Sequence, residues 1–362
     1  MAKIGLPRLI IGAFLAILAG AGFYLGLSMD QIISNMLTRF GMNLLLVLAL
    51  IPTIQSGSGP NFGLPFGIIC GLVTATLAIE WDMRGFTALA FAVAAAIPLG
   101  ALAGYLYGLL LNRVKGQEMT VGTYMGFSIV SLMSIFWLMA PYKSPEMIWP
   151  YGGNGLRVTI VLKDRMDQLL DKLWAFQVGD ILPDGVESAL MGNRYLANLV
   201  KVQVPTGLLL FAALCCLGLW LFMRTKTGVA MQIVGSNPRF ADATGLNVNR
   251  YRVLGSMISC AMAAAGIIIY SQSFGFLQLY QAPLYMALYM VSAILIGGAS
   301  LQRATITHAI IGTFLFNGLL VAALPVANEV VPGDISEVVR VIISNGIILY
   351  ALSRKEEGGH AK

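Results

Sequence analysis

Uncharged polar side chains that interrupt long apolar stretches are the best candidates for binding chemistry in this sequence. Amide and hydroxyl groups beside aromatic rings bind hydroxyl-rich solutes. The candidates lie within or at the ends of apolar blocks: Gln55, Ser56, Asn61, Thr123, Asn317 and Asn345, with the aromatic residues Phe62, Tyr124 and Tyr270. From these we predict a solute path through Gln55, Ser56, Asn61, Phe62, Tyr124 and Asn317. The competing interpretation for each is hydrogen bonding between packed helices.

Asn61 and Phe62 are the foremost of these candidates, because glycines and prolines around them indicate broken backbone. Broken backbone at membrane depth is tolerated where it lines a cavity. A dense positive lining for phosphates or carboxylates is absent from the apolar blocks. We therefore predict a small neutral polar solute, a simple sugar or a nucleoside, and leave hydrophobic amino acids open.

The sequence offers little for covalent or metal chemistry. Its two histidines, His308 and His360, cannot form a His-rich metal cluster, and its four cysteines all fall inside apolar blocks, where they pack as small side chains. No Gly-x-Ser-x-Gly elbow and no Gly-x-x-x-x-Gly-Lys-Ser/Thr phosphate loop occurs. We expect no catalytic residues, no metal and no cofactor in this chain, and hence no enzyme.

Composition indicates an all-α polytopic membrane protein. Of 362 residues, 57% are hydrophobic and 11% charged, and the hydrophobic residues form blocks of about twenty, enough to cross ~30 Å of hydrocarbon as helices. The first block is longer than a signal-peptide core, so we expect a retained span. We predict about ten spans within a single membrane domain, residues 1–362: 6–27, 38–54, 62–80, 86–111, 119–140, 205–223, 252–272, 284–300, 305–323 and 338–353.

The basic residues predict the orientation, because cytoplasmic loops of membrane proteins are enriched in Lys and Arg. With both termini inside, the cytoplasmic segments hold Lys3, Arg8, Arg113, Lys115, Arg224, Lys226, Arg239, Arg250, Arg252, Arg303, Arg354, Lys355 and Lys362. The net charge of +6 is thus explained without a nucleic-acid partner. We predict cytoplasmic N- and C-termini, a cytoplasmic loop at 224–250 and an extracytoplasmic loop at 141–204.

Two further patterns concern the long loop and the chain as a whole. In the loop, Met166, Leu169, Leu170 and Leu173 follow helical spacing, which predicts an amphipathic helix. It would lie on the outer rim of the bundle or form a docking surface for a solute-binding partner. Spans 2–5 and 7–10 would run in opposite senses, and each set has a Gly-rich interruption, which suggests an inverted repeat.

A short helix is predicted in the cytoplasmic loop, between residues 237 and 245. Asn237 is a good N-cap, Pro238 suits the first helical position, and Gly245 can end the helix in a left-handed conformation. A helix of about two turns is marginal in water. It therefore packs on its own bundle or docks into a cytoplasmic partner.

This segment resembles the coupling helix of ABC-importer permeases in the branched-chain amino acid, ribose and nucleoside superfamily. The matching positions are Gly235, Asn237, Pro238, Ala241, Gly245 and, conservatively, Leu246. The sequence departs from the pattern at Arg239 and Phe240. Residues 293–301 and 317–319 resemble the sugar permeases, and residues 61–64 resemble a signature of the nucleoside permeases.

The resemblance implies an inverted-repeat importer permease in a bacterial-type plasma (inner) membrane. It implies cytoplasmic ATP-binding subunits, which would hold ATP and Mg and contact Gly235, Asn237, Pro238, Arg239, Phe240, Ala241 and Gly245. It also implies a second permease subunit and an extracytoplasmic solute-binding protein. An ion-coupled secondary transporter is the main alternative, although the predicted spans hold almost no acidic residue to bind a coupling ion. A passive channel would leave the capped helix unexplained.

Overall fold

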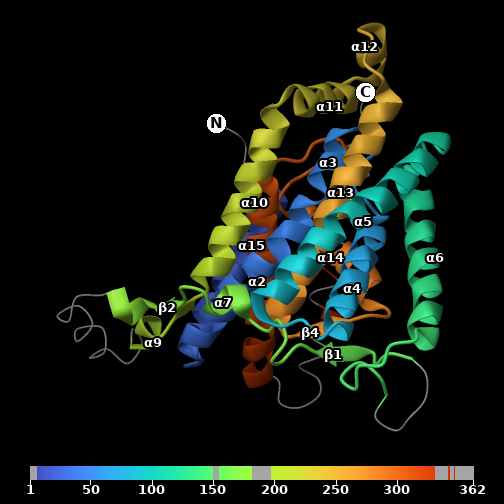
Figure 1. Ribbon diagram of the computed structural model, residues 1–362. Coiled ribbons are helices and arrows are strands. Elements are labelled where there is room, and N and C mark those ends of the chain that lie inside the picture. The colour runs from blue at the N-terminus through green and yellow to red at the C-terminus, as the bar shows by residue number, and fades with distance from the viewer. Residues whose placement is uncertain (1–5, 150–154, 182–196, 331–340, 343–345, 347–362) are drawn as a thin grey trace.

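The fold is a bundle of apolar helices, seen in a computed structural model that describes residues 6–149, 155–181, 197–330, 341–342 and 346 (Figure 1). The helices of the bundle are α1 (Leu6–Tyr24), α2 (Met29–Leu48), α3 (Ile51–Gln55), α4 (Leu64–Glu80), α5 (Gly85–Arg113), α6 (Glu118–Met139), α10 (Thr206–Arg224), α13 (Val248–Phe274), α14 (Ala282–Ile296) and α15 (Ile306–Val330). These helices confirm the predicted all-α membrane class.

Among the described residues, six helical stretches are long and apolar enough to span a membrane, one of them α2 together with α3. The helices α1, α4 and α14 are shorter and also apolar. Nine of the ten predicted spans thus correspond to described helices. The tenth, 338–353, lies almost wholly outside the described residues. The number of spans, the orientation of the termini and the inverted repeat remain predictions.

The centre of the bundle is α13, which packs along α5 and α4. Small residues allow the close approach. A Cβ added at Gly104 of α5 would lie 2.5 Å from the carbonyl oxygen of Ser256, and one at Gly100 would lie 2.7 Å from that of Cys260. Close backbone contact of this kind is how membrane helices gain van der Waals energy. On the other side α15 packs against α2 and α14, and α1 packs on α15.

The two long connecting segments lie at opposite ends of the bundle (Figure 1). One end carries α11 (Lys226–Ser236) and α12 (Pro238–Ala243). The other carries β1 (Thr159–Val161), which pairs antiparallel with β4 (Phe276–Gln278), and β2 (Phe176–Gln177), which pairs with β3 (Gln203–Val204). Short helical turns η1 (Val178–Ile181) and α9 (Ala197–Val200) flank the second ladder. The side of the membrane on which each segment lies stays a prediction.

The predicted amphipathic helix of the 141–204 segment is wrong in extent. Within residues 166–173, where the helix was predicted, one turn is helical, α7 (Leu169–Lys172). Gln168 and Trp174 on either side take positive φ angles of 51° and 53°, which ends the helix in both directions. Met166 and Leu170 are nevertheless buried, and Leu169 and Leu173 are half-buried. The hydrophobic spacing therefore indicates apolar residues that pack on the bundle, but it does not predict the length of the helix.

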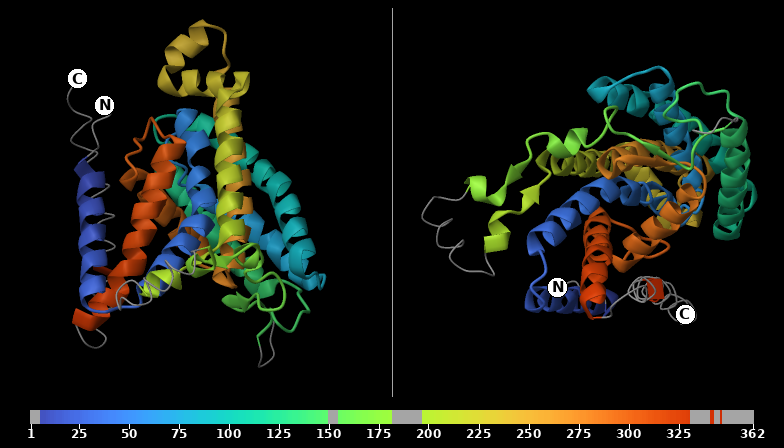
Figure 2. Two further views of the ribbon diagram at one scale, coloured as in Figure 1. Left: turned by 90° about the vertical axis from the view of Figure 1, so that its left-hand side faces the viewer. Right: turned by 90° about the horizontal axis from the view of Figure 1, so that it is seen from below.

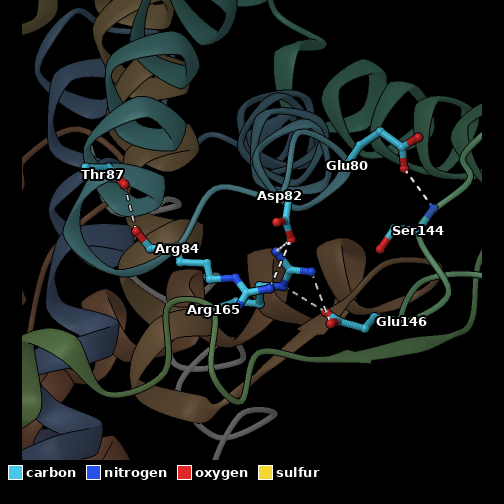
Figure 3. A network of polar contacts seen from close by, with 7 residues as sticks. All are labelled: Glu80, Asp82, Arg84, Thr87, Ser144, Glu146 and Arg165. Carbon is cyan, nitrogen blue, oxygen red and sulfur yellow. Dashed lines mark hydrogen bonds and ion pairs between the residues drawn. The ribbon is translucent and has the colours of Figure 1, made fainter.

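A cluster of charged residues fastens this segment to the α4–α5 turn (Figure 3). Arg165, 8% exposed, binds both carboxylate oxygens of Glu146 at 3.0 and 3.1 Å and also pairs with Asp82. Hydrogen bonds from Arg165, and then from Arg84, lower the pKa of Asp82. Glu80 accepts hydrogen bonds from the backbone N–H groups of residues 143 and 144. The segment is thus held by the bundle.

Candidate functional site

A cavity of about 440 Å³ opens between α2, α13, α14 and α15. It mixes amide, aromatic and apolar side chains. Its lining residues are Asn35, Arg39, Met42, Asn43, Tyr270, Met286, Tyr289, Met290, Phe316, Asn317, Leu320, Val321, Leu324, Pro325 and Val341. Ligand pockets in proteins are of this size and hold a few polar groups among apolar ones.

The polar centre of the cavity is a pair of buried amides on different helices. Nδ2 of Asn43 on α2 donates to Oδ1 of Asn317 on α15 at 2.9 Å and to the carbonyl oxygen of Arg39 at 2.9 Å. Nδ2 of Asn317 donates to the carbonyl oxygen of Thr313. Both asparagines are no more than 5% exposed. The pair links α2 to α15 and borders the cavity, so it can serve packing and solute contact together.

Aromatic rings complete the lining. Tyr270 comes from α13, while Tyr289 of α14 and Phe316 of α15 have ring centroids 6.1 Å apart. Asn35 and Arg39 supply exposed polar groups from the first half of α2. Amide donors and acceptors beside aromatic faces can hold a hydroxyl-rich molecule by hydrogen bonds and stacking.

The structure places Asn317 in this cavity, together with Tyr270, but not the other residues predicted for the solute path. Asn43 was missed, although the signal existed: it is an amide directly before the apolar run Leu44 to Leu50. Asn345 lies outside the described residues. Thr123 bonds to the carbonyl oxygen of its own helix at Met119.

Three predicted path residues lie around the break between α3 and α4 and take part in packing. Nε2 of Gln55 donates to the carbonyl oxygen of Ala304, in the break between α14 and α15. Oγ of Ser56 donates to the carbonyl oxygen of Thr53 at 3.0 Å. Nδ2 of Asn61 donates to Oγ of Ser259 at 2.8 Å, while its Oδ1 is buried without a partner among the described residues. Their role in a solute path stays a prediction.

Phe62 and Tyr124 lie apart from the cavity. Phe62 is half-buried, and a Cβ added at Gly126 of α6 would lie 3.0 Å from its carbonyl oxygen. Tyr124, on α6, is 69% exposed. Its side chain is therefore mostly outside the packed bundle.

The short helix predicted between residues 237 and 245 is present as α12. Oδ1 of Asn237 accepts the N–H of Phe240 at 3.0 Å, and Pro238 takes the first helical position. Gly245 has φ +81°, and the N–H of Leu246 reaches back to the carbonyl oxygen of Ala241 at 2.9 Å. Both ends are thus capped as the residue types predict.

Most of α12 is exposed beyond the end of the bundle (Figures 1 and 2). Ala241 is its one buried residue, while Phe240 is 55% exposed and Arg239 is exposed beside it. A groove of about 560 Å³ runs along this helix, lined by Lys115, Pro238, Arg239, Asp242, Gly245, Leu246, Asn247, Val248 and Asn249. An exposed aromatic ring on a rigid, capped helix suits a docking contact.

The α11–α12 segment is directly packed on the α3–α4 break. A Cβ at Gly235, at the end of α11, would overlap the carbonyl oxygen of Gln55 and lie 2.9 Å from the N of Gly57. Nearby, Arg252 at the start of α13 pairs with Glu118 of α6, and its Nε donates to Oγ of Ser58 at 3.3 Å. A movement of the α11–α12 segment would therefore displace the backbone at the α3–α4 break.

These features define a multi-pass helical membrane protein with an internal polar cavity at one place and a projecting helix at one end. The sequence matches the family described as "Branched-chain amino acid transport system / permease component" over residues 32–351. The chain belongs to this family of permease components. The resemblance noted in the sequence is thereby confirmed.

Individual relatives are similar over differing lengths. The autoinducer 2 import system permease protein LsrC of Enterobacter sp. (strain 638) is 25% identical over 308 residues, which are 84% of this chain and 75% of that protein. LsrC of Klebsiella pneumoniae is 25% identical over 265 residues, 71% of this chain and 63% of that protein. LsrD of Salmonella typhimurium is 31% identical over 137 residues, 36% of this chain and 40% of that protein. No solved structure matches the chain.

Proposed function

We propose that the chain is the membrane-spanning subunit of an ATP-binding-cassette importer, with ATP hydrolysis on separate cytoplasmic subunits. The observation that carries this proposal is α12, a short helix capped at both ends whose only buried residue is Ala241. Such a helix is too short to be stable alone in water. Docking into an ATPase subunit explains its capping, its exposure and its contact with the bundle through Gly235.

The proposed solute is small, neutral and polar, with a simple sugar preferred. The support is the cavity between α2, α13, α14 and α15, where the amides of Asn43 and Asn317 lie among aromatic rings. The relatives named for autoinducer 2 import favour an importer of a small molecule. A nucleoside fits the same lining. A branched-chain amino acid is the second candidate, because the family description names that class.

The proposed assembly has two permease subunits, two ATPase subunits and an extracytoplasmic binding protein that delivers the solute. In it, nucleotide-driven closure moves α12. Gly235 transmits the movement to the α3–α4 break, and the bundle alternates between outward and inward access. In the proposed assembly the 141–204 segment, which Arg165 attaches to the bundle, contacts the binding protein.

The test of the importer proposal is purification of the chain from its native membranes in mild detergent. Bound proteins are identified and ATPase activity is measured. We expect a stoichiometric ATPase subunit that is lost when Ala241 is replaced by Glu, since a charge cannot be buried at that position. A chain that purifies alone, and that moves solute down an ion gradient in liposomes, would replace this proposal with a secondary transporter.

The solute class is tested by uptake into liposomes that contain the purified complex and its binding protein. Radiolabelled ribose, uridine and leucine serve as probes of the three candidate classes. ATP-dependent uptake of ribose, competed by other sugars and not by leucine, supports the sugar assignment. Uptake of leucine alone would favour the amino-acid candidate while leaving the importer mechanism in place.

A further inference from the structure

Arg8 lies in the first turn of α1 and packs against the break between α14 and α15. Its guanidinium lies directly over Gly298, where a Cβ would overlap Nη2 and Nε of Arg8. Gly298 has φ +85°. Figure 2 shows that α1 starts at the end of the bundle that carries α11 and α12. A charged side chain thus occupies a slot that only glycine leaves open, at the edge of the apolar region.

This slot gives Arg8 no acceptor within the described part of the chain. Its Nε is buried without a hydrogen-bond partner, and none of the ion pairs between described residues involves it. The helices packed around α1 are α15 and α14. In their sequences and in that of α1 the only acidic residue is Glu329, at the far end of α15. A buried guanidinium nitrogen without an acceptor is costly.

His308 adds a second polar group at the same place. It lies in the first turn of α15, and its Nδ1 is buried without a partner among the described residues. The backbone of His308 packs against Gly297, the residue before the Gly298 that Arg8 covers, because a Cβ at Gly297 would overlap the carbonyl oxygen of His308. The backbone N–H of His308 is already capped by Oγ1 of Thr305 at 3.3 Å. The imidazole, not the amide, is therefore the group that lacks a partner.

The geometry points to a binding site for the phosphate of an anionic phospholipid, held by Arg8 over Gly298 with His308 beside it. A guanidinium presents parallel N–H groups that match two phosphate oxygens. Basic pockets between membrane helices bind anionic headgroups. A lipid is favoured over free phosphate because Arg8 lies at the end of a 19-residue apolar helix, at headgroup depth. The lipid joins the outer helix α1 to the α14–α15 break.

The test compares the wild-type chain with Arg8→Gln in nanodiscs of phosphatidylcholine, with and without phosphatidylglycerol. Thermal stability and retained lipid, measured by native mass spectrometry, are the readouts. We expect phosphatidylglycerol to raise the melting temperature of the wild type. We expect Arg8→Gln to retain about fivefold less phosphatidylglycerol than the wild type. This factor corresponds to the ~1 kcal/mol that one basic residue contributes at an anionic lipid surface. Arg113→Gln, an equal loss of charge at the exposed end of α5, is the matched control and should keep the lipid.

Three outcomes would overturn the site. Equal retention by wild type and Arg8→Gln would remove Arg8 from lipid binding. Loss of lipid from both Arg8→Gln and Arg113→Gln would show attraction by net charge alone. Inorganic phosphate that stabilises the wild type in phosphatidylcholine as well as the anionic lipid does would assign the site to a free anion. If Arg8→Gln fails to insert into the membrane, the lipids retained by wild type purified from native membranes provide the test. The proposal requires that these lipids be enriched in anionic species, and a lack of enrichment overturns it.

Discussion

The Cα of Gly235, at the end of α11, packs against the backbone of Gln55, at the end of α3, so closely that no side chain fits between them. Gln55 in turn reaches the carbonyl oxygen of Ala304 through its side chain. The segment that carries α12 is therefore in contact with one helix break directly and with a second through a single residue. This is a short route from a proposed ATPase contact to the middle of the bundle.

Replacing Gly235 by Ala should separate α11 from α3. The added methyl group must displace backbone, which costs ~1–3 kcal/mol in an overpacked site. We expect a lower melting temperature and uptake that falls more than ATPase activity does. Gly218→Ala on α10 is the control, because a Cβ there meets nothing within 4 Å. Unchanged uptake and melting in Gly235→Ala would contradict the role given to this contact.

Asn317 and Asn61 should respond differently to replacement by Ala. Asn317 borders the cavity, so Asn317→Ala should raise the apparent KM for uptake about tenfold, the worth of one good hydrogen bond. Asn61 bonds to Ser259 inside the packing, so Asn61→Ala should lower the melting temperature and leave KM unchanged. A raised KM in Asn61→Ala with an unchanged KM in Asn317→Ala would instead indicate a solute path at the α3–α4 break.

Phe240→Ala should weaken attachment of the ATPase without disturbing the bundle. The ring is 55% exposed, and loss of an aromatic anchor from an interface costs about 2 kcal/mol, or roughly 30-fold in affinity. The amount of ATPase that co-purifies is the measurement. Tyr124→Ala, which removes an exposed aromatic ring from α6, is the control. Equal co-purification in both variants would exclude Phe240 from the contact.

Acid should loosen the attachment of the 141–204 segment. Because the pKa of Asp82 is lowered in the folded protein, its charged form contributes stability above about pH 4, and that contribution is lost as the pH falls through the lower, folded pKa. Asp82→Asn should therefore melt earlier than wild type at neutral pH, and the difference should vanish in acid. Asp164→Asn, in the attached segment, serves as control, because Asp164 makes no ion pair among the described residues. A difference that persists in acid would contradict this assignment.

Much of the fold could be predicted because membrane helices depend on local composition. Apolar blocks near twenty residues gave α5, α6, α10 and α13 within a few residues of their observed ends. The division of one predicted span into α2 and α3 was not foreseen, although Pro52 at the start of α3 lacks the N–H that a continuous helix would bond to the carbonyl oxygen of Leu48. The single turn at α7 was also missed, because its ends are set by left-handed residues that hydrophobic spacing does not report.

The short helix α12 was easier to predict than the cavity for a physical reason. Caps act within four residues, so Asn237, Pro238 and Gly245 predict α12 by themselves. The cavity joins residues far apart in sequence, such as Asn43 and Asn317. A polar residue in an apolar block can bond to a neighbouring helix or bind the solute. Which of the two it does depends on how helices distant in the sequence pack together.

The bond between Gln55 and Ala304 joins the two helix breaks through uncharged groups. Dissolved salt screens charges but has little effect on a neutral hydrogen bond inside a bundle. The charged cluster around Arg165 at the opposite end includes the exposed Asp82 and is open to such screening. The two ends should therefore differ in their sensitivity to ionic strength: salt should have little effect on the Gln55–Ala304 bond, and it should weaken the ion pairs that help to attach the 141–204 segment.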